Sequence, residues 1–292
     1  MRQAALLAEN GAFVQSFDTG GTAAGAAAAA AKALKAKPAL ILGPLGAEEV
    51  PAVASTIAGR VPVIAFSNNS VLRAPNVWIF GITAGQVTSA ILRYARSRGV
   101  KSVAVIDDGT PWSAAATLAA GRMEAELGIR VTVLQVQAGL ALPNPGDAPD
   151  AVLLPGSGEA VLAAGRALKD SGVQLLATLQ GLDHRPQALE ALDGAWIASP
   201  DPVAFGAFAA EFAARNGGDA GTITALAYDV AGIANTLRKA GTLGGEGLLD
   251  SRGFQCVTGP VRFRTDGSVA RDFAILAAKA DGYTPVAVSS GS

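Results

Sequence analysis

The stretch PALILGPLGAEEVPAVASTI, residues 38–57, decides the fold pattern of this chain. Its apolar run Ala39–Leu42 is typical of a β-strand, and the loop GPLG follows directly. A helical segment comes next, with Glu48 and Glu49 in its first turn. A strand that delivers a glycine loop to a helix N-terminus can bind an anion or simply turn the chain. Because the two glutamates already complement the helix dipole, the sequence weakens the anion-binding alternative.

The same alternation of strand and helix extends in both directions from this stretch. Further strands are predicted at 11–17, 61–67, 76–82, 102–108, 130–136, 151–156, 175–182 and 194–200, with helices at 23–36, 47–59 and 157–171 and from residues 83, 110, 201 and 223. A DG turn predicts a hairpin over 260–269, and two short strands are predicted over 273–288. Repeated alternation predicts parallel sheets covered by helices. Since the pattern restarts near Thr83, we expect two such lobes.

Composition excludes several classes of function. With 23 Lys plus Arg against 24 Asp plus Glu, the chain lacks the basic excess of a nucleic-acid partner. Its single cysteine, Cys256, rules out an internal disulfide, and its single histidine, His184, rules out metal sites built on several imidazoles. We expect no metal and no cofactor. No apolar run reaches the roughly 18 residues of a transmembrane helix, and MRQAALLAEN at the start does not have the pattern of a signal peptide.

Two glycine-containing motifs are weaker than they look. DTGGTAAG, residues 18–25, is neither a dinucleotide-binding fingerprint nor a phosphate-binding P-loop, so a turn is favoured over a nucleotide site. PGSGE, residues 155–159, resembles the nucleophile elbow of hydrolases but has a proline where that motif needs glycine. A catalytic triad would need both Ser157 and His184, so Ser157 is favoured as a helix N-cap.

Polar groups also follow two predicted strands. Asp107 and Asp108 could hold Mg²⁺, but a solvated loop is favoured because the neighbouring sequence offers no other acids. His184 could contact a ligand, although an ordinary loop histidine is favoured. Both groups lie where α/β proteins bind ligands, beyond the carboxyl ends of strands.

The segments GPLGAEE, VPVIAFSNN, NVWIFGIT, SRGVKSVAVIDDGTPW, AYDVAGIANTL and GPVRFRTDG, in this order, resemble the type I periplasmic binding proteins. The leucine and branched-chain amino-acid receptors are the most similar group, and the match runs from Met1 to about Val286. The combination GPL, AFS and FGIT also resembles lipoproteins that activate penicillin-binding proteins. The resemblance implies a non-enzymatic periplasmic protein with two lobes and three crossings between them. Lobe 1 would comprise residues 1–83 and 202–258, and lobe 2 residues 84–201 and 259–292.

The resemblance also implies the residues that bind the ligand. They are Gly46, Ala47, Ser67, Asn68 and Asn69 in lobe 1, and Thr110, Trp112, Gly156, Ser157, Leu182 and Asp183 in lobe 2. In amino-acid receptors the first-lobe loops hold the ligand carboxylate, and an acid of the second lobe meets the amine. Trp112 could stack on a planar or apolar part of the solute. For the cluster Ser67–Asn69, a turn that uses asparagine in the left-handed conformation is an equal alternative.

Three departures bear on this comparison. Ala47 stands where a hydroxyl residue is expected, and Leu182 stands where an acid often lies, with Asp183 beside it. The family's first strand and the start of its first helix are not represented in this sequence. We therefore expect a longer precursor that carries an export signal, and any membrane attachment would be through a lipid anchor outside this chain.

Two functions follow as hypotheses. In the first, the lobes close over a small polar solute by hinging near Thr83, Pro200 and Gly259, and deliver it to an ABC permease. In the second, the same fold docks on a cell-wall synthase without binding a small solute. A cleft with convergent polar groups would favour the first hypothesis, and a cleft filled by the chain's own side chains the second.

Overall fold

A computed structural model describes residues 1–9, 13–135, 148–156 and 158–291. The chain forms two compact units: unit 1 contains residues 1–83 and 203–271, and unit 2 contains residues 84–202 and 272–292. The structure keeps residues 259–271 in unit 1, whereas the sequence assigned them to the second lobe. The reason is a hairpin: strand β9 (Val261–Phe263) pairs with the first residues of β10 (Val269–Lys279), which still belong to unit 1.

Unit 1 is built on a three-stranded parallel sheet in the order β1-β2-β3. Its strands are short: β1 is Ile41–Leu42, β2 is Val63–Ala65 and β3 is Val77–Ile79. All residues of β2 and β3 are buried, as expected for strands covered on both faces.

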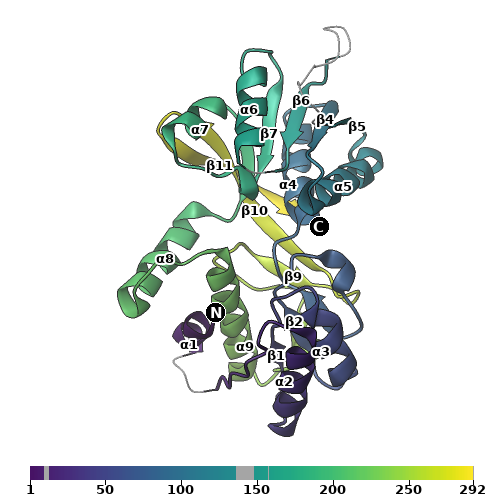
Figure 1. Cartoon of the computed structure of the whole chain (residues 1–292), viewed down its shortest axis with the longest axis vertical. Helices are drawn as coiled ribbons and strands as arrows, with labels where there is room; N and C mark the ends of the chain where they lie inside the picture. The colour runs from purple at the N-terminus through teal and green to yellow at the C-terminus, as the bar shows by residue number, and fades with distance from the viewer. Residues whose placement is uncertain (10–12, 136–147, 157, 292) are drawn as a thin grey trace. The chain divides into compact units, whose positions relative to one another are not determined.

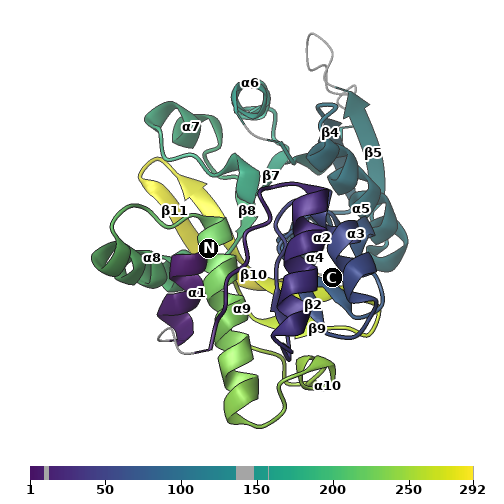
Figure 2. The same cartoon turned by 60° about the horizontal axis from the view of Figure 1, so that its bottom comes forward.

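The helices of unit 1 pack in pairs around this sheet. They are α1 (Arg2–Glu9), α2 (Ala23–Lys35), α3 (Glu49–Ile57), α8 (Pro202–Asn216), α9 (Thr222–Lys239) and α10 (Gly245–Leu248), with a 3₁₀ turn η1 at Ser70–Leu72. Helix α1 packs on α9 and α2 packs on α3 (Figures 1 and 2). The alanine-rich segment forms α2 as predicted, because alanine is the best helix former and its small side chain allows close packing.

The strand predicted at residues 11–17 is wrong for the part of it that the structure describes. Residues 14–19 have no regular secondary structure and are assigned to neither sheet. The side chain of Phe13 is 65% exposed. A segment with strand-like composition becomes a strand only when another strand lies at hydrogen-bonding distance.

Unit 2 contains a larger, mixed sheet with the order β11-β10-β8-β7-β6-β4-β5. Its other strands are β4 (Ser102–Asp107), β5 (Arg130–Gln135), β6 (Ala151–Leu154), β7 (Gln174–Thr178), β8 (Trp196–Ser199) and β11 (Gly282–Gly291). The strands from β5 to β8 are parallel, as expected from the alternation of strands and helices, and β10 pairs antiparallel with β8, a pairing that the sequence analysis did not specify. The two C-terminal strands are also longer than expected, at 11 and 10 residues.

The helices of unit 2 are α4 (Ala84–Ser97), α5 (Pro111–Leu127), α6 (Glu159–Leu168) and α7 (Pro186–Ala191), with a 3₁₀ turn η2 at Leu179–Gly181. The predicted cap at α5 is confirmed, because Thr110 Oγ1 accepts a hydrogen bond from the N–H of Ser113 at 3.2 Å and Pro111 opens the helix. Within the described parts of the chain, no helix is long and apolar enough to cross a membrane.

A buried polar network ties α9 to β10 inside unit 1. Asp229 accepts hydrogen bonds from the N–H of Val257 at 2.7 Å and from the hydroxyl of Thr258 at 2.5 Å. The same hydroxyl accepts a bond from Arg271, which is fully buried and also donates to the carbonyl oxygen of Phe80 at 2.7 Å. Thr258 therefore lies between a buried acid and a buried base and bonds to both, whereas Arg271 Nε has no hydrogen-bond partner among the described residues.

Candidate functional site

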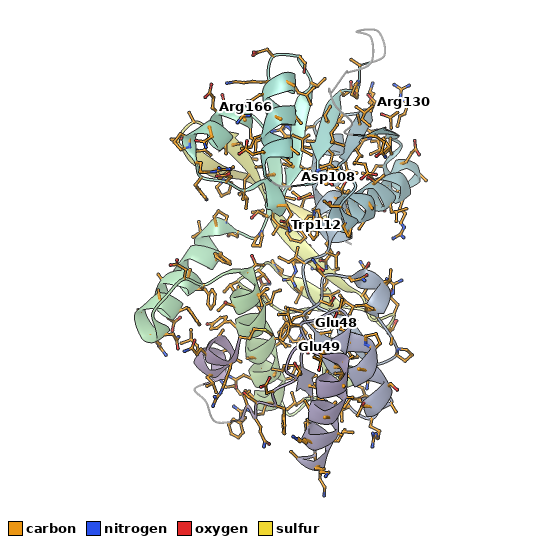
Figure 3. The ribbon with its side chains drawn as sticks, viewed as in Figure 1. Glu48, Glu49, Asp108, Trp112, Arg130 and Arg166 are labelled. Atoms are coloured by element: carbon orange, nitrogen blue, oxygen red, sulfur yellow. The ribbon has the colours of Figure 1, made fainter. Side chains whose placement is uncertain are left out.

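In unit 1, the loop after β1 satisfies its own helix terminus. The N–H of Gly46 donates to Glu49 Oε2 at 2.7 Å, and the N–H of Glu49 donates back to the carbonyl oxygen of Gly46 at 3.1 Å. In the first bond the carboxylate reaches back to an N–H three residues earlier, as the acid of a capping box does, whereas the second is a backbone bond of the turn, since Gly46 has no side chain. Glu49 is only 4% exposed, whereas Glu48 is exposed and its side chain makes no capping bond. Figure 3 shows both glutamates at the start of α3.

A side chain at position 46 would displace the carboxylate of Glu49. A Cβ atom there would lie 2.8 Å from Glu49 Oε2, closer than such contacts normally come. The carboxylate of Glu49 thus occupies the position that a ligand carboxylate would need to reach this N–H. Its other oxygen, Oε1, is buried with no hydrogen-bond partner among the described residues. Ala47, which is exposed, offers only its backbone.

The loop after β2 brings Ser67, Asn68 and Asn69 together. Ser67 is buried, and its Oγ accepts a hydrogen bond from the N–H of Asn69 at 3.2 Å. Asn69 Oδ1 accepts from the N–H of Val71 at 3.2 Å and so caps the 3₁₀ turn. Both asparagines are exposed.

The left-handed alternative for this cluster is wrong. Asn69 has φ −91°, and in the described parts of the chain the non-glycine residues with positive φ are Lys37, Ala58 and Asn76. The loop is held instead by a close backbone approach, since a Cβ at Gly81 would lie 2.3 Å from the carbonyl oxygen of Ser67.

In unit 2, the two acids after β4 organise their own loop. Asp107 accepts hydrogen bonds from the N–H of Gly109 at 3.0 Å, the hydroxyl of Ser113 at 2.9 Å and the amide of Gln135 at 3.1 Å. These bonds, the backbone one first, lower the pKa of Asp107. Asp108 accepts from both the N–H and the hydroxyl of Thr110, at 3.0 and 2.7 Å. The described residues contain no group of three or more acidic, histidine or cysteine side chains able to hold a metal ion.

Asp108 also reaches the neighbouring loop after β6. Its Oδ2 lies so close to Gly156 that a Cβ on that residue would clash with it. A cavity of about 10 Å³ beside them, lined by Ile106, Leu154 and Val161, is close to the space that one water molecule occupies. Ser157 lies outside the described residues, and the residue at the N-cap of α6 is Gly158 rather than the predicted Ser157.

Trp112 projects from the first turn of α5, close to Asp108 (Figure 3). It is partly buried, and its indole N–H is buried with no hydrogen-bond partner among the residues described. Thr110 is exposed, but its hydroxyl already donates to Asp108 and accepts from the N–H of Ser113 at the helix cap. Because this N–H is buried, a ligand would reach it only if the side chain of Trp112 moved.

Asp183 is already paired within unit 2. Its carboxylate forms a two-pronged ion pair with Arg185, with distances of 2.6 and 2.8 Å to Oδ2, and this pairing lowers the pKa of Asp183. The backbone of Asp183 is held by the hydroxyl of Tyr283, whose ring also packs edge-on against His184 with the ring centroids 5.1 Å apart. Leu182 packs against the hydrophobic core.

The predicted site residues lie in separate loops of each unit. In unit 1, Ser67, Asn68 and Asn69 lie in the loop after β2, and Gly46 and Ala47 lie in the loop after the neighbouring strand β1. In unit 2, Thr110 and Trp112 lie at the start of α5, and Asp183 lies after η2. Sequence reasoning missed Glu49 as an internal ligand of Gly46 and missed Arg185 and Tyr283 as partners of Asp183. The spacing G-x-x-E at residues 46–49 and D-x-R at 183–185 were the available signals.

The model of the periplasmic binding protein family matches residues 13–283. The C-domain of LpoA from Haemophilus influenzae, a regulator of PBP1A, has a TM-score of 0.77 at 16% identity, covering 98% of this chain and 94% of that one. None of the curated protein sequences is similar enough to match the chain.

Two transport proteins share the fold as well. A branched-chain amino acid ABC transporter periplasmic ligand-binding protein from Burkholderia xenovorans has a TM-score of 0.69 at 14% identity, covering 99% of this chain and 90% of that one. The leucine-binding protein LivK from Thermotoga maritima has a TM-score of 0.63 at 20% identity, covering 99% and 93%.

Proposed function

The chain belongs to the periplasmic binding protein family, and on that basis we propose that it is a non-enzymatic solute receptor. It would act in the periplasm, bind a small polar solute such as an amino acid or a similar compound, and deliver it to an ABC permease. The loops of unit 1 and unit 2 would contact the same solute, with closure of the two units over it.

One observation carries this proposal: in both units the polar groups gather just beyond the carboxyl ends of parallel strands. Ser67–Asn69 follow β2, and Asp108, Thr110 and Trp112 follow β4. Ligands of α/β proteins bind at this end of the strands. The exposed asparagine amides supply donors and acceptors without a charged group, and the partly buried ring of Trp112 supplies an apolar surface.

The geometry also narrows the class of solute. A free amino acid needs donors for its carboxylate and an acid for its amine, but the N–H of Gly46 is bound to Glu49, and Asp183 is bound to Arg185. A zwitterion must displace these internal partners or rely on other groups. Solutes that present hydroxyl or amide groups meet no such competition, so we expect them to bind at least as tightly as amino acids.

A thermal-shift screen tests the proposal. The purified chain is heated with amino acids, short amides, nucleosides and sugars, each added separately. A solute at 100 times its dissociation constant stabilises the folded state by about 2.7 kcal/mol, which gives a clear rise in melting temperature. A panel that produces no rise, with a folded protein, contradicts the solute-receptor proposal.

Variants then locate the site. Asn68→Ala removes an exposed amide, so we expect little change in folding stability but a dissociation constant raised roughly 3- to 10-fold, the equivalent of about one hydrogen bond. Asn216→Ala at the end of α8 is the matched control and should leave binding unchanged. Equal affinity in both variants would remove the loop after β2 from the site.

A second function is favoured by a specific observation. Both groups best suited to an amino acid, the N–H of Gly46 and the carboxylate of Asp183, are occupied by the chain's own side chains. This is what we expect of a domain that acts by docking on a protein, and the LpoA domain shares its fold. Under this alternative no solute raises the melting temperature, and the chain co-purifies with a cell-wall synthase of its host.

A further inference from the structure

Glu49 is a buried acid that the chain itself satisfies only in part. The residue is 4% exposed, and its Oε2 accepts a hydrogen bond from the N–H of Gly46 at 2.7 Å. Its Oε1 is buried as well and has no hydrogen-bond partner among the described residues. A carboxylate can accept about four hydrogen bonds, so one oxygen of this group lacks the donors that water would give it.

Within the described residues, no basic side chain balances the charge of this carboxylate. Glu49 takes part in none of the ion pairs formed there, whereas Asp183 is paired with Arg185. Glu48, which is exposed, adds a second negative charge beside it. A buried carboxylate without a base is costly, and a positively charged donor reduces that cost most. The start of α3 therefore has an excess of negative charge that a cationic ligand would offset.

The position of Glu49 connects it with the polar loop after β2. Its carboxylate is bonded to the loop after β1, and the N–H of Phe66 joins the two loops by donating to the carbonyl oxygen of Pro44 at 2.8 Å. Asn68 and Asn69 follow Phe66 closely in sequence and are exposed. The acid and the two amides therefore belong to adjacent loops at the carboxyl ends of β1 and β2, where α/β proteins bind ligands.

Because Oε1 is buried, a ligand reaches it only when the side chain of Glu49 turns outward. That turn breaks the bond to Gly46 and frees the N–H of this residue. An ammonium group on the ligand would then pair with the carboxylate, and a hydroxyl or carbonyl oxygen of the same ligand would accept the freed N–H. A ligand carboxylate at that N–H would instead lie close to the carboxylate of Glu49 and be repelled by it.

We propose that the solute bound by the loops of unit 1 carries an ammonium group and no carboxylate, and that Glu49 is the residue that selects it. This inference rests on the proposed solute receptor and names the chemical class of its ligand. Amino amides, diamines and amino sugars belong to that class. Their positive charge supplies the partner that the chain does not provide for Glu49, and their other polar groups suit the amides of Asn68 and Asn69.

Matched pairs of compounds test the selection by charge. Alaninamide and lactamide, diaminobutane and butanediol, and glucosamine and glucose differ chiefly in that an ammonium group replaces a hydroxyl group. In at least one pair, calorimetric titration of the chain should give a dissociation constant lower by roughly tenfold or more for the ammonium member. Alanine, which has the ammonium group of alaninamide but carries a carboxylate, should bind more weakly than alaninamide.

The substitution Glu49→Gln separates the charge from the fold. Glutamine has nearly the same shape, and its side-chain carbonyl oxygen can still accept the N–H of Gly46, so the variant should stay folded. We expect it to bind the two members of a pair with nearly equal dissociation constants. Glu48→Gln removes the exposed neighbouring charge and is the matched control, which should keep the preference for the ammonium member. The comparisons in the parent chain remain decisive if Glu49→Gln does not fold.

The outcomes separate the selection by Glu49 from the proposed function. Binding of some solutes with no preference for the ammonium member of any pair overturns the selection and leaves the solute receptor standing. A preference that survives Glu49→Gln, or that Glu48→Gln removes to the same extent, also overturns it. If no compound of the three pairs binds, and no solute of the thermal-shift screen does, the receptor itself is contradicted and the selection falls with it.

Discussion

Glu49 shows how one side chain can decide what a loop is able to bind. Its carboxylate is buried against the N–H of Gly46, at the position where a helix N-terminus would otherwise attract an anion. The sequence correctly indicated that the acids of this turn satisfy the helix from within. It could not show that Glu49 alone does so, because that depends on which of two adjacent side chains points back along the chain.

Substituting Glu49 tests this role. Glu49→Ala should lower the free energy of unfolding by about 1–3 kcal/mol, because it leaves the partly buried N–H of Gly46 without its partner. Urea denaturation monitored by circular dichroism measures the change. Glu48→Ala, on the exposed neighbouring residue, should cost less than about 0.5 kcal/mol. Equal losses in the two variants would show that the bond to Gly46 contributes nothing.

We expect the carboxyl group of Asp150 to make the stability of the folded chain depend on pH. The N–H groups of Lys101 and Ser102 and the hydroxyl of Ser102 all donate to its Oδ2, at 2.8, 2.9 and 3.1 Å. The bond from the N–H of Lys101 is the main cause that lowers the pKa of Asp150 below the ordinary value of an aspartate carboxyl group. The unfolded chain therefore binds more protons than the folded one, so this contribution to stability is present above about pH 4 and is lost as pH falls through the folded-state pKa.

The measurement is the urea midpoint between about pH 6 and pH 2. Asp150→Asn should be less stable than the parent near neutral pH and should lose less of its stability on acidification. Asp281→Asn, in the turn between β10 and β11, is a suitable control. A pH dependence that is unchanged by Asp150→Asn would contradict the assignment.

At the scale of elements, the network of Asp229, Thr258 and Arg271 joins α9, the segment before β9 and the start of β10. Arg271→Ala should lower the free energy of unfolding by about 3–5 kcal/mol, because it leaves Asp229 buried without a base nearby. Urea denaturation provides the value. Arg264→Ala, on an exposed residue of the same hairpin, should change it by less than about 0.5 kcal/mol. A small loss at Arg271 would mean that water reaches the cluster.

Helices and strands could be predicted from the sequence where the local residue pattern and the contacts in the folded chain favour the same structure. The apolar run at Val61–Ser67 contains β2, the Thr110–Pro111 pair opens α5, and the DG turn joins β9 to β10. Residues 11–17 have equal strand character, but pairing depends on a neighbour that their own sequence does not specify. The antiparallel position of β10 beside β8 was missed for the same reason, since it is set by partners about 75 residues away in sequence.

At the scale of the whole molecule, the order of weak motifs identified the family better than any single motif did. The candidate site was less predictable, because residues matched to a family pattern can be occupied by their own neighbours. Gly46 lies in a loop that matches the pattern and Asp183 lies beside the position expected for the acid, yet each is bound within its own unit. The sequence indicates such an internal partner only when the partner lies a few residues away, as Arg185 does from Asp183. Tyr283, which holds the backbone of Asp183, lies 100 residues further along the chain.

If a single solute contacts both units, substitutions in either unit must weaken its binding. Trp112→Ala in unit 2 removes a partly buried ring and an unpaired indole N–H, so we expect the dissociation constant to rise at least tenfold. Asn68→Ala in unit 1 should raise it less, and calorimetric titration of the double variant should show almost no binding. Leu118→Ala, at a position of α5 that is 65% exposed, should bind like the parent. A solute whose affinity depends on Asn68 but not on Trp112 would bind to unit 1 alone, and closure of both units over it would then be the wrong mechanism.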